Sequence, residues 1–238
     1  MTDDLDQIPW HTLSHAYGVA TDTPQHLRNL IHPDPMVSNQ AHSALSASIV
    51  HQGGVSEAAI AAFPYLLRIS LTSSGPTRSY AAVLAMIIIK GIAPPHASSI
   101  PCGYFLYANR QIEDYQDAAE ARAIIYPLVI QNFPALLPLL HDPDEDIAVK
   151  MLHIVACCSI TDGAIWSQIA PYAQAEQRPK FQASYQVIAW RSGNPLALAW
   201  VAETFEKAHE PLVTLTAALV LAHIVRWCCI VGHWPNEP

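Results

Sequence analysis

Histidine is the residue type in this chain with the greatest potential for chemistry. The sequence holds twelve histidines against twelve lysines and arginines, and imidazole binds metals and transfers protons near neutral pH. His11 and His15 are four residues apart, a spacing that places two imidazoles on one face of a helix. No His-Glu-x-x-His pattern and no third ligand accompany them, so we expect no metal site and no cofactor.

Two similar groups of residues predict a binding rim at one edge of the molecule. His15 and Tyr17 precede one glycine, and His51 and Gln52 precede another, so both groups fall where a helix would end. We expect them to form a binding site together with Trp10. One interpretation is that the imidazoles only bind the free carbonyl groups at helix ends. In the alternative, the protein is an enzyme and His15 or His51 is its general acid or base.

Charge and motifs exclude several function classes. Twelve basic against twenty acidic residues give a formal charge of −8, which argues against a nucleic-acid-binding face. The sequence has no glycine-rich phosphate loop, no Gly-x-Ser-x-Gly pattern and no Cys-Gly-x-Cys-Trp pattern. We therefore favour a protein without catalytic activity and leave the enzymatic alternative open.

The cysteines indicate a reducing compartment. Cys102 stands alone, and the pairs Cys157-Cys158 and Cys228-Cys229 lie in apolar stretches without C-x-x-C spacing. Buried, reduced thiols of this kind are typical of cytoplasmic proteins. The N-terminal sequence MTDDLDQIPW is acidic and lacks an apolar region, so we expect no secretory signal.

The most apolar stretch of the chain runs from Leu212 to Gly232. It is long enough to span a bilayer, but His223 and Arg226 would be costly inside one. We therefore interpret it as a buried amphipathic helix and expect no membrane contact. Leu212, Leu215, Leu219 and Ala222 fall on one face of that helix.

The elements that position these residues follow from an internal repeat with a period of about 40 residues. A segment that starts at Pro24 matches, without a gap, a segment that starts at Pro134, and a partial copy starts at Pro64. The apolar residues within each copy recur at helical spacing. We predict a capping helix over 5–17, an irregular insertion over 93–103, and helix pairs over 24–52, 55–91, 112–159, 164–192 and 195–231.

The repeated unit resembles a known family. Pro-x-x-Leu-x-x-Leu, then Pro-Asp, then Val or Ile at the head of a second helix resembles the HEAT repeat of the armadillo-type superfamily. HEAT repeats usually carry an arginine after that Val, where this chain has Ser38 in one copy and Lys150 nearby in another. The motifs Trp10-x-x-Leu13-x-His15-Ala-Tyr17-Gly18 and His51-Gln52-Gly53 are similar to the opening of bacterial HEAT-repeat proteins without assigned function.

The resemblance implies an all-α fold, with residues 1–238 forming a single right-handed α-solenoid of about five HEAT-like helix pairs. It also implies a non-catalytic scaffold that binds a protein partner along its curved surface, such as a bacterial regulatory or immunity-type protein. The acidic charge would suit a basic partner. The alternative is a small-molecule-binding protein or enzyme with an apolar groove lined by histidine, tyrosine and tryptophan.

Overall fold

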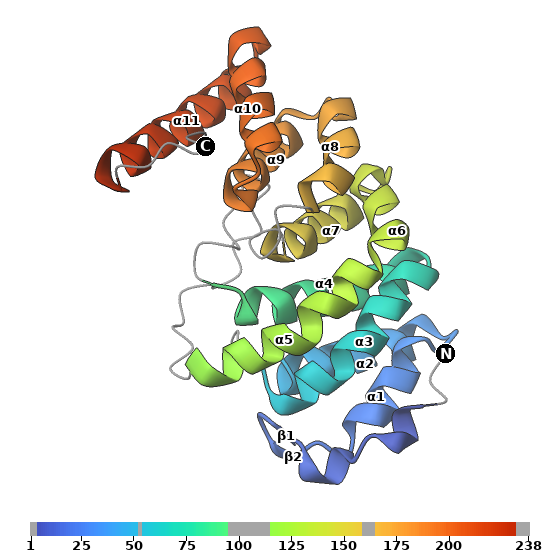
Figure 1. Ribbon diagram of the computed structural model, residues 1–238. Helices are drawn as coiled ribbons and strands as arrows, with labels where there is room; N and C mark the ends of the chain where they lie inside the picture. Colours follow the sequence, from blue (N-terminus) through green and yellow to red (C-terminus); the bar gives the residue numbers. More distant parts are fainter. Residues whose placement is uncertain (1–3, 52–53, 95–114, 159–164, 232–238) are drawn as a thin grey trace. The chain divides into compact units, whose positions relative to one another are not determined.

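The computed structural model describes residues 4–51, 54–94, 115–158 and 165–231, and most of these residues are helical (Figure 1). The only sheet within these ranges has two short strands, which confirms the predicted all-α class. The chain divides into two compact units. Among the described residues, the first unit extends to Cys157 and the second begins at Cys158.

The first residues form turns and a hairpin, so the capping helix predicted over 5–17 is wrong. Pro9 lacks the amide hydrogen that the interior of such a helix requires. Gly18 has a φ of +116°, a conformation that favours glycine and reverses the chain. The observed elements are the 3-10 turns η1 (Leu5–Gln7) and η2 (Trp10–Thr12) and the antiparallel strands β1 (Ser14–His15) and β2 (Gly18–Val19).

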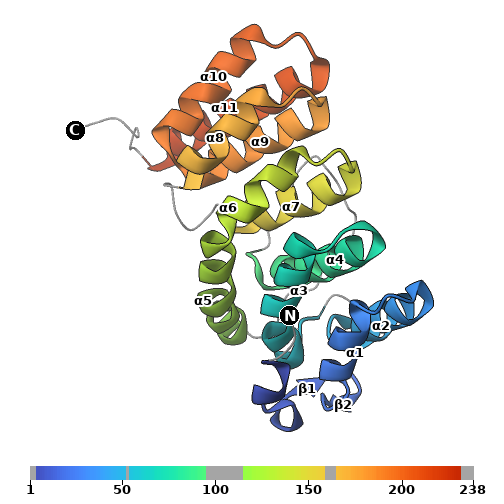
Figure 2. The ribbon, with the colours of Figure 1, turned by 90° about the vertical axis from the view of Figure 1, so that its right-hand side faces the viewer.

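Two helix pairs follow: α1 (Thr23–Leu30) with α2 (Pro35–Ser48), and α3 (Glu57–Thr72) with α4 (Gly75–Ile92). The second pair holds the core of this unit, because most of its apolar side chains are buried on several faces. It contacts the first pair through α1 with α3 and α2 with α4 (Figure 2). Asp34 starts α2 by accepting a hydrogen bond of 2.9 Å from the Met36 amide, a typical N-cap.

The next helical segment is interrupted. It consists of α5 (Tyr115–Gln131), α6 (Phe133–Leu136), the 3-10 turn η4 (Leu137–His141) and α7 (Glu145–Cys158). A bend of 61° separates residues 118–131 from 133–141. Pro134 and Pro138 stand in the first turns of α6 and η4. They therefore begin new segments, because proline loses no hydrogen bond in a first turn.

A polar network connects α7 to α4. The buried Lys150 ammonium group donates to Asp146 on its own helix and, at 2.9 Å, to Ser79 Oγ of α4. Ser79 in turn donates to Asp146 at 2.9 Å. Because an unpaired buried charge is strongly unfavourable, these contacts explain how the buried Lys150 is accommodated.

The described residues of the second unit form four helices: α8 (Ile165–Ala175), α9 (Pro179–Ser192), α10 (Pro195–Lys207) and α11 (Pro211–Val231). α9 contacts the other three, and α10 also contacts α11 (Figure 1). Gly193 ends α9 with a φ of +62°, and Asn194 caps α10 by accepting from the Leu196 amide at 2.9 Å. The indole rings of Trp166 and Trp200 lie 5.3 Å apart and join α8 to α10.

α11 buries a different face from the one that its leucine spacing indicated. Val213, Thr216, Ala217 and Val220 are buried. The predicted apolar stripe is instead open: Leu215 is 59% exposed and Leu219 is 62% exposed. The helix is therefore apolar on two sides, and only one of them packs within the described residues.

Each predicted helix-pair range contains helices near its expected ends, whereas their arrangement as one solenoid stays a prediction. The predicted insertion over 93–103 lies, beyond its first two residues, outside the described residues. Cys157 and Cys158 are buried and are not joined in a disulfide bond, as predicted. Among the described helices, none alone is long and apolar enough to cross a bilayer. The bent pair 118–131 and 133–141 meets that test only in combination.

Candidate functional site

The N-terminal hairpin brings together three of the predicted site residues. The ring of Tyr17 lies 6.2 Å from that of His15 and 5.7 Å from that of His51, both edge-on. The hairpin is fixed there by its backbone, because the Ala16 amide donates to the Ser48 carbonyl at the end of α2 at 3.0 Å. Ser14 adds hydrogen bonds from its amide and hydroxyl to Glu57, at the start of α3.

His15 has both ring nitrogens engaged. Nδ1 accepts a hydrogen bond of 3.1 Å from the Tyr17 amide, so Nε2 carries the proton and donates to Asp22 Oδ1 at 2.9 Å. Its side chain is only 4% exposed. An imidazole held in this way has no free nitrogen with which to accept a proton from a substrate.

Asp22 holds His15 in this orientation. Its second carboxylate oxygen lies 3.6 Å from His26 Nε2 of α1. Partial burial raises the pKa of Asp22, but the hydrogen bond from His15 and the electrostatic attraction of His15 and His26 outweigh burial, so the pKa lies below its usual value. Sequence reasoning missed Asp22, because the hairpin between the two residues brings it next to His15 and a helix was expected there instead.

His51 and Tyr17 are the accessible members of the group. His51 Nδ1 donates to the Ala47 carbonyl at 3.0 Å, as predicted for a side chain that caps α2. Nε2 has no partner within the part of the chain that the structure describes. Tyr17 is 68% exposed and Val19 is 57% exposed. We name Tyr17, Val19 and His51 the hairpin patch.

The other predicted site residues do not join the hairpin patch. Trp10 is buried, and its indole donates to the Leu5 carbonyl at 2.8 Å, so it stabilises the N-terminal turns. Gln52 lies outside the described residues. Within the described ranges, no three histidine, cysteine, aspartate or glutamate side chains are grouped to hold a metal ion.

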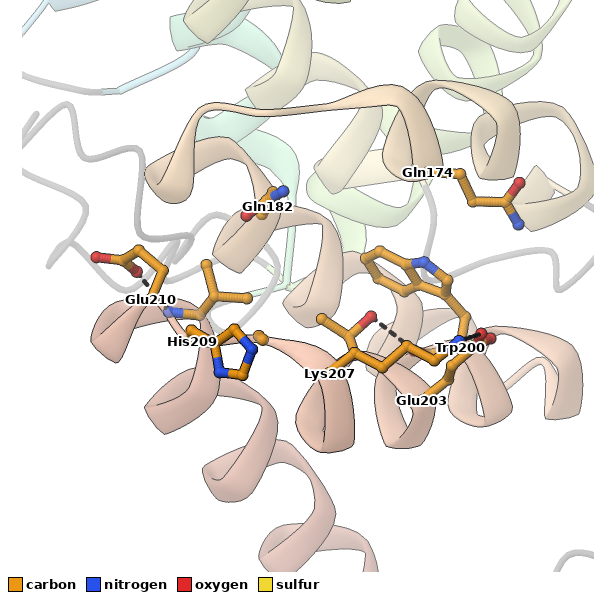
Figure 3. A pocket seen from close by; sticks show the side chains of 10 residues that line it. Gln174, Gln182, Trp200, Glu203, Lys207, His209 and Glu210 are labelled. Atoms are coloured by element: carbon orange, nitrogen blue, oxygen red, sulfur yellow. Dashed lines mark hydrogen bonds and ion pairs between the residues drawn. The ribbon is translucent and has the colours of Figure 1, made fainter.

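A second candidate site is an open groove of about 630 Å³ in the second unit (Figure 3). Trp200 is its main aromatic residue. Its polar groups are largely occupied: Lys207 pairs with Glu203 at 2.5 Å, and Glu210 accepts from the Val213 amide at 3.0 Å. The hydrogen bond to Glu203 raises the pKa of Lys207. The groove lining is Gln174, Gln182, Trp200, Glu203, Thr204, Lys207, Ala208, His209, Glu210 and Val213.

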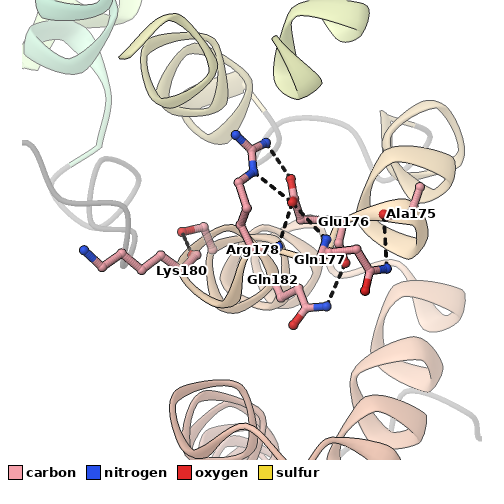
Figure 4. Close-up of polar contacts among 7 residues, drawn as sticks. Ala175, Glu176, Gln177, Arg178, Lys180 and Gln182 are labelled. Carbon is pink, nitrogen blue, oxygen red and sulfur yellow. Dashed lines mark hydrogen bonds and ion pairs between the residues drawn. The ribbon is translucent and has the colours of Figure 1, made fainter. Parts of the chain in front are cut away.

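A buried carboxylate next to this groove is structural. Glu176 accepts from Nε and Nη2 of the Arg178 guanidinium, at 2.9 and 2.8 Å, and from the amides of Gln177 and Arg178 (Figure 4). Burial raises the pKa of Glu176, but these hydrogen bonds, chiefly from the Arg178 side chain, lower it below its usual value. Arg178 also lies over the Phe181 ring, 3.6 Å from its centre. Every oxygen of Glu176 is thus engaged in fixing the start of α9.

The comparisons with known proteins identify no relative from which a function could be inferred. Neither a known protein-family model nor a curated protein matches the sequence. The HEAT resemblance therefore stays a prediction that rests on the repeated residues themselves.

Proposed function

We propose that the protein is a non-catalytic scaffold of HEAT-like helix pairs, stacked as a right-handed α-solenoid, that binds a protein partner. The hairpin patch is the contact that we assign to this partner. The supporting observation is the position of Tyr17, which is 68% exposed although its backbone amide is fixed by His15. An ordered, exposed tyrosine beside other apolar surface is typical of a binding hot spot.

The geometry of His15 argues against the enzymatic alternative. A general base needs a free nitrogen within reach of substrate, and His15 has none. His51 keeps one open nitrogen, but no acidic partner orients it among the described residues. Its ring instead packs edge-on against Tyr17, which fits a recognition surface better than a proton-transfer site.

The chemistry of the whole chain suggests what kind of partner this is. A formal charge of −8 favours encounter with a basic protein. Cys157 and Cys158 are buried and not in a disulfide bond, which is compatible with a reducing cytoplasm. We therefore propose a cytoplasmic regulatory or immunity-type role in a bacterium, in which this acidic scaffold binds and restrains a basic protein.

Affinity capture with matched variants tests this proposal. The tagged chain and its Tyr17→Ala variant are used to capture proteins and small molecules from native lysate, followed by mass spectrometry. We expect a stoichiometric protein that Tyr17→Ala loses. The control is Met36→Ala, which removes an equally exposed apolar side chain (69%) from α2 and should retain the partner.

A different result would support the small-molecule alternative. The groove beside Trp200 is the observation that favours it. A bound small molecule without any protein, lost in Trp200→Ala and retained in Tyr17→Ala, would overturn the scaffold proposal. A reaction abolished by His51→Ala would do the same.

A further inference from the structure

The open face of α11 is an apolar feature that the first two sites leave unexplained. Leu215 and Leu219 are 59% and 62% exposed, Ala222 is exposed, and Ala218 is half-buried. These four residues recur at steps of three and one, so they form a single stripe along the helix. We name Leu215, Ala218, Leu219 and Ala222 the α11 stripe. Exposed apolar side chains gathered in this way mark an interaction surface.

The charge of this surface narrows the choice of partner. Positions 211–222 of α11 contain no aspartate, glutamate, lysine or arginine. The chain as a whole carries a formal charge of −8, so two copies repel each other over most of their surface. Residues 211–222 add no charged side chain to that repulsion, and two antiparallel helices also place opposite ends of their dipoles together.

The large and small side chains of the α11 stripe in one copy can fit those of the same stripe in a second copy. If two copies cross antiparallel about a twofold axis between Ala218 and Leu219, Leu215 faces Ala222 of the other copy. Leu219 then faces Ala218 of the other copy. Each leucine meets an alanine, and symmetry produces every contact twice. Alternation of large and small residues is what close helix packing requires.

We propose that the α11 stripe is a self-association surface, and that a second copy of this chain covers it in an antiparallel helix pair. A different protein would also need an apolar surface to bind here. The leucine–alanine pairing specifically favours a second copy of this chain. The α11 stripe spans only Leu215 to Ala222, so the contact that it provides buries less than the ~1,600 Å² of a standard interface. The dimer is therefore reversible and dependent on concentration.

Sedimentation velocity from about 1 µM to about 1 mM protein tests this surface. The wild-type chain should shift from monomer to dimer. Ala222→Leu should weaken the dimer about tenfold or more, because a leucine then meets Leu215 of the other copy. Leu215→Ala should also weaken it, because the contact is lost. The double variant Leu215→Ala/Ala222→Leu exchanges the two partners and should restore the dimer.

If the double variant dimerises again, the dimer depends on the specific leucine–alanine pairing and not on unspecific apolar association. Ala222→Leu makes the helix more apolar, so a stronger dimer in that variant would overturn the antiparallel pairing. A monomer at all concentrations in the wild type would overturn self-association and leave the face to another partner. Met36→Ala should dimerise as the wild type does, and circular dichroism checks that each variant stays folded. Tyr17→Ala should leave the dimer unchanged, so this inference fails or holds independently of the proposed function.

Discussion

His15 and His51 have the same side chain, but their different hydrogen-bond partners give them different roles. Both ring nitrogens of His15 are engaged in hydrogen bonds that fix the hairpin. His51 uses one nitrogen at the end of α2 and leaves the other open. The spacing of the histidines indicated that both lie at one edge, but it could not show which nitrogen is engaged, because that depends on contacts between residues far apart in the chain.

Removing each imidazole should reveal this difference in the free energy of unfolding. His15→Ala removes the partner of Asp22 Oδ1 and of the Tyr17 amide, and we expect a loss of about 1–3 kcal/mol. His51→Ala removes a partly exposed cap and should cost less than about 1 kcal/mol. Urea denaturation measures both, with exposed His11→Ala as the control. Equal losses for His15 and His51 would contradict the assigned hydrogen bonds.

His42 should make stability depend on pH. Burial, together with the charge of Lys150, lowers its pKa below 6.5. The unfolded chain therefore binds a proton at His42 more readily, so stability present above pH 6.5 is lost as the pH falls below it, by at most about 1.4 kcal/mol per pH unit. His42→Phe keeps a ring stacked on Tyr80, 4.5 Å away in the native protein. Its urea midpoint should fall less between pH 7 and pH 5 than that of the wild type, and an equal fall would contradict the prediction.

At the scale of elements, helix ends were predictable where sequence-local groups form them. Asp34, Asn194 and the prolines that follow them mark the starts of α2 and α10, and all contacts involved lie within two residues. The N-terminal hairpin was not predictable in this way. It depends on Gly18 and on Ser14 reaching Glu57, 43 residues away. The buried face of α11 also required knowledge of its neighbours, because both of its sides are apolar.

Glu176 shows what one buried carboxylate contributes to an element. Glu176→Gln keeps the shape of the side chain but removes the charge that four hydrogen bonds from Arg178 and Gln177 share. Because breaking a buried pair leaves the partner charge uncompensated, we expect a loss of about 2–4 kcal/mol, reduced by the partial exposure of Arg178. Thermal unfolding followed by circular dichroism measures it. Glu203→Gln, in an exposed pair with Lys207, is the matched control and should change stability little.

At the scale of the whole molecule, the net charge affects both proposed associations: partner binding through the hairpin patch and self-association through the α11 stripe. The proposed partner is attracted by the charge of −8, whereas a second copy is repelled by it. The two associations therefore have opposite electrostatic terms, although both use exposed apolar side chains. Their response to salt can separate them without any substitution.

Raising the ionic strength from about 0.02 M to about 0.5 M shortens the range of charge interactions several-fold. Partner capture through the hairpin patch should weaken, because attraction between the acidic chain and a basic protein is screened. Dimerisation through the α11 stripe should strengthen, because repulsion between like-charged copies is screened while the apolar contact remains. Sedimentation velocity and capture yield at both salt concentrations measure the two effects. A dimer that dissociates at high salt would mean that charged groups hold the two copies together, and the neutral α11 stripe could not then be their interface.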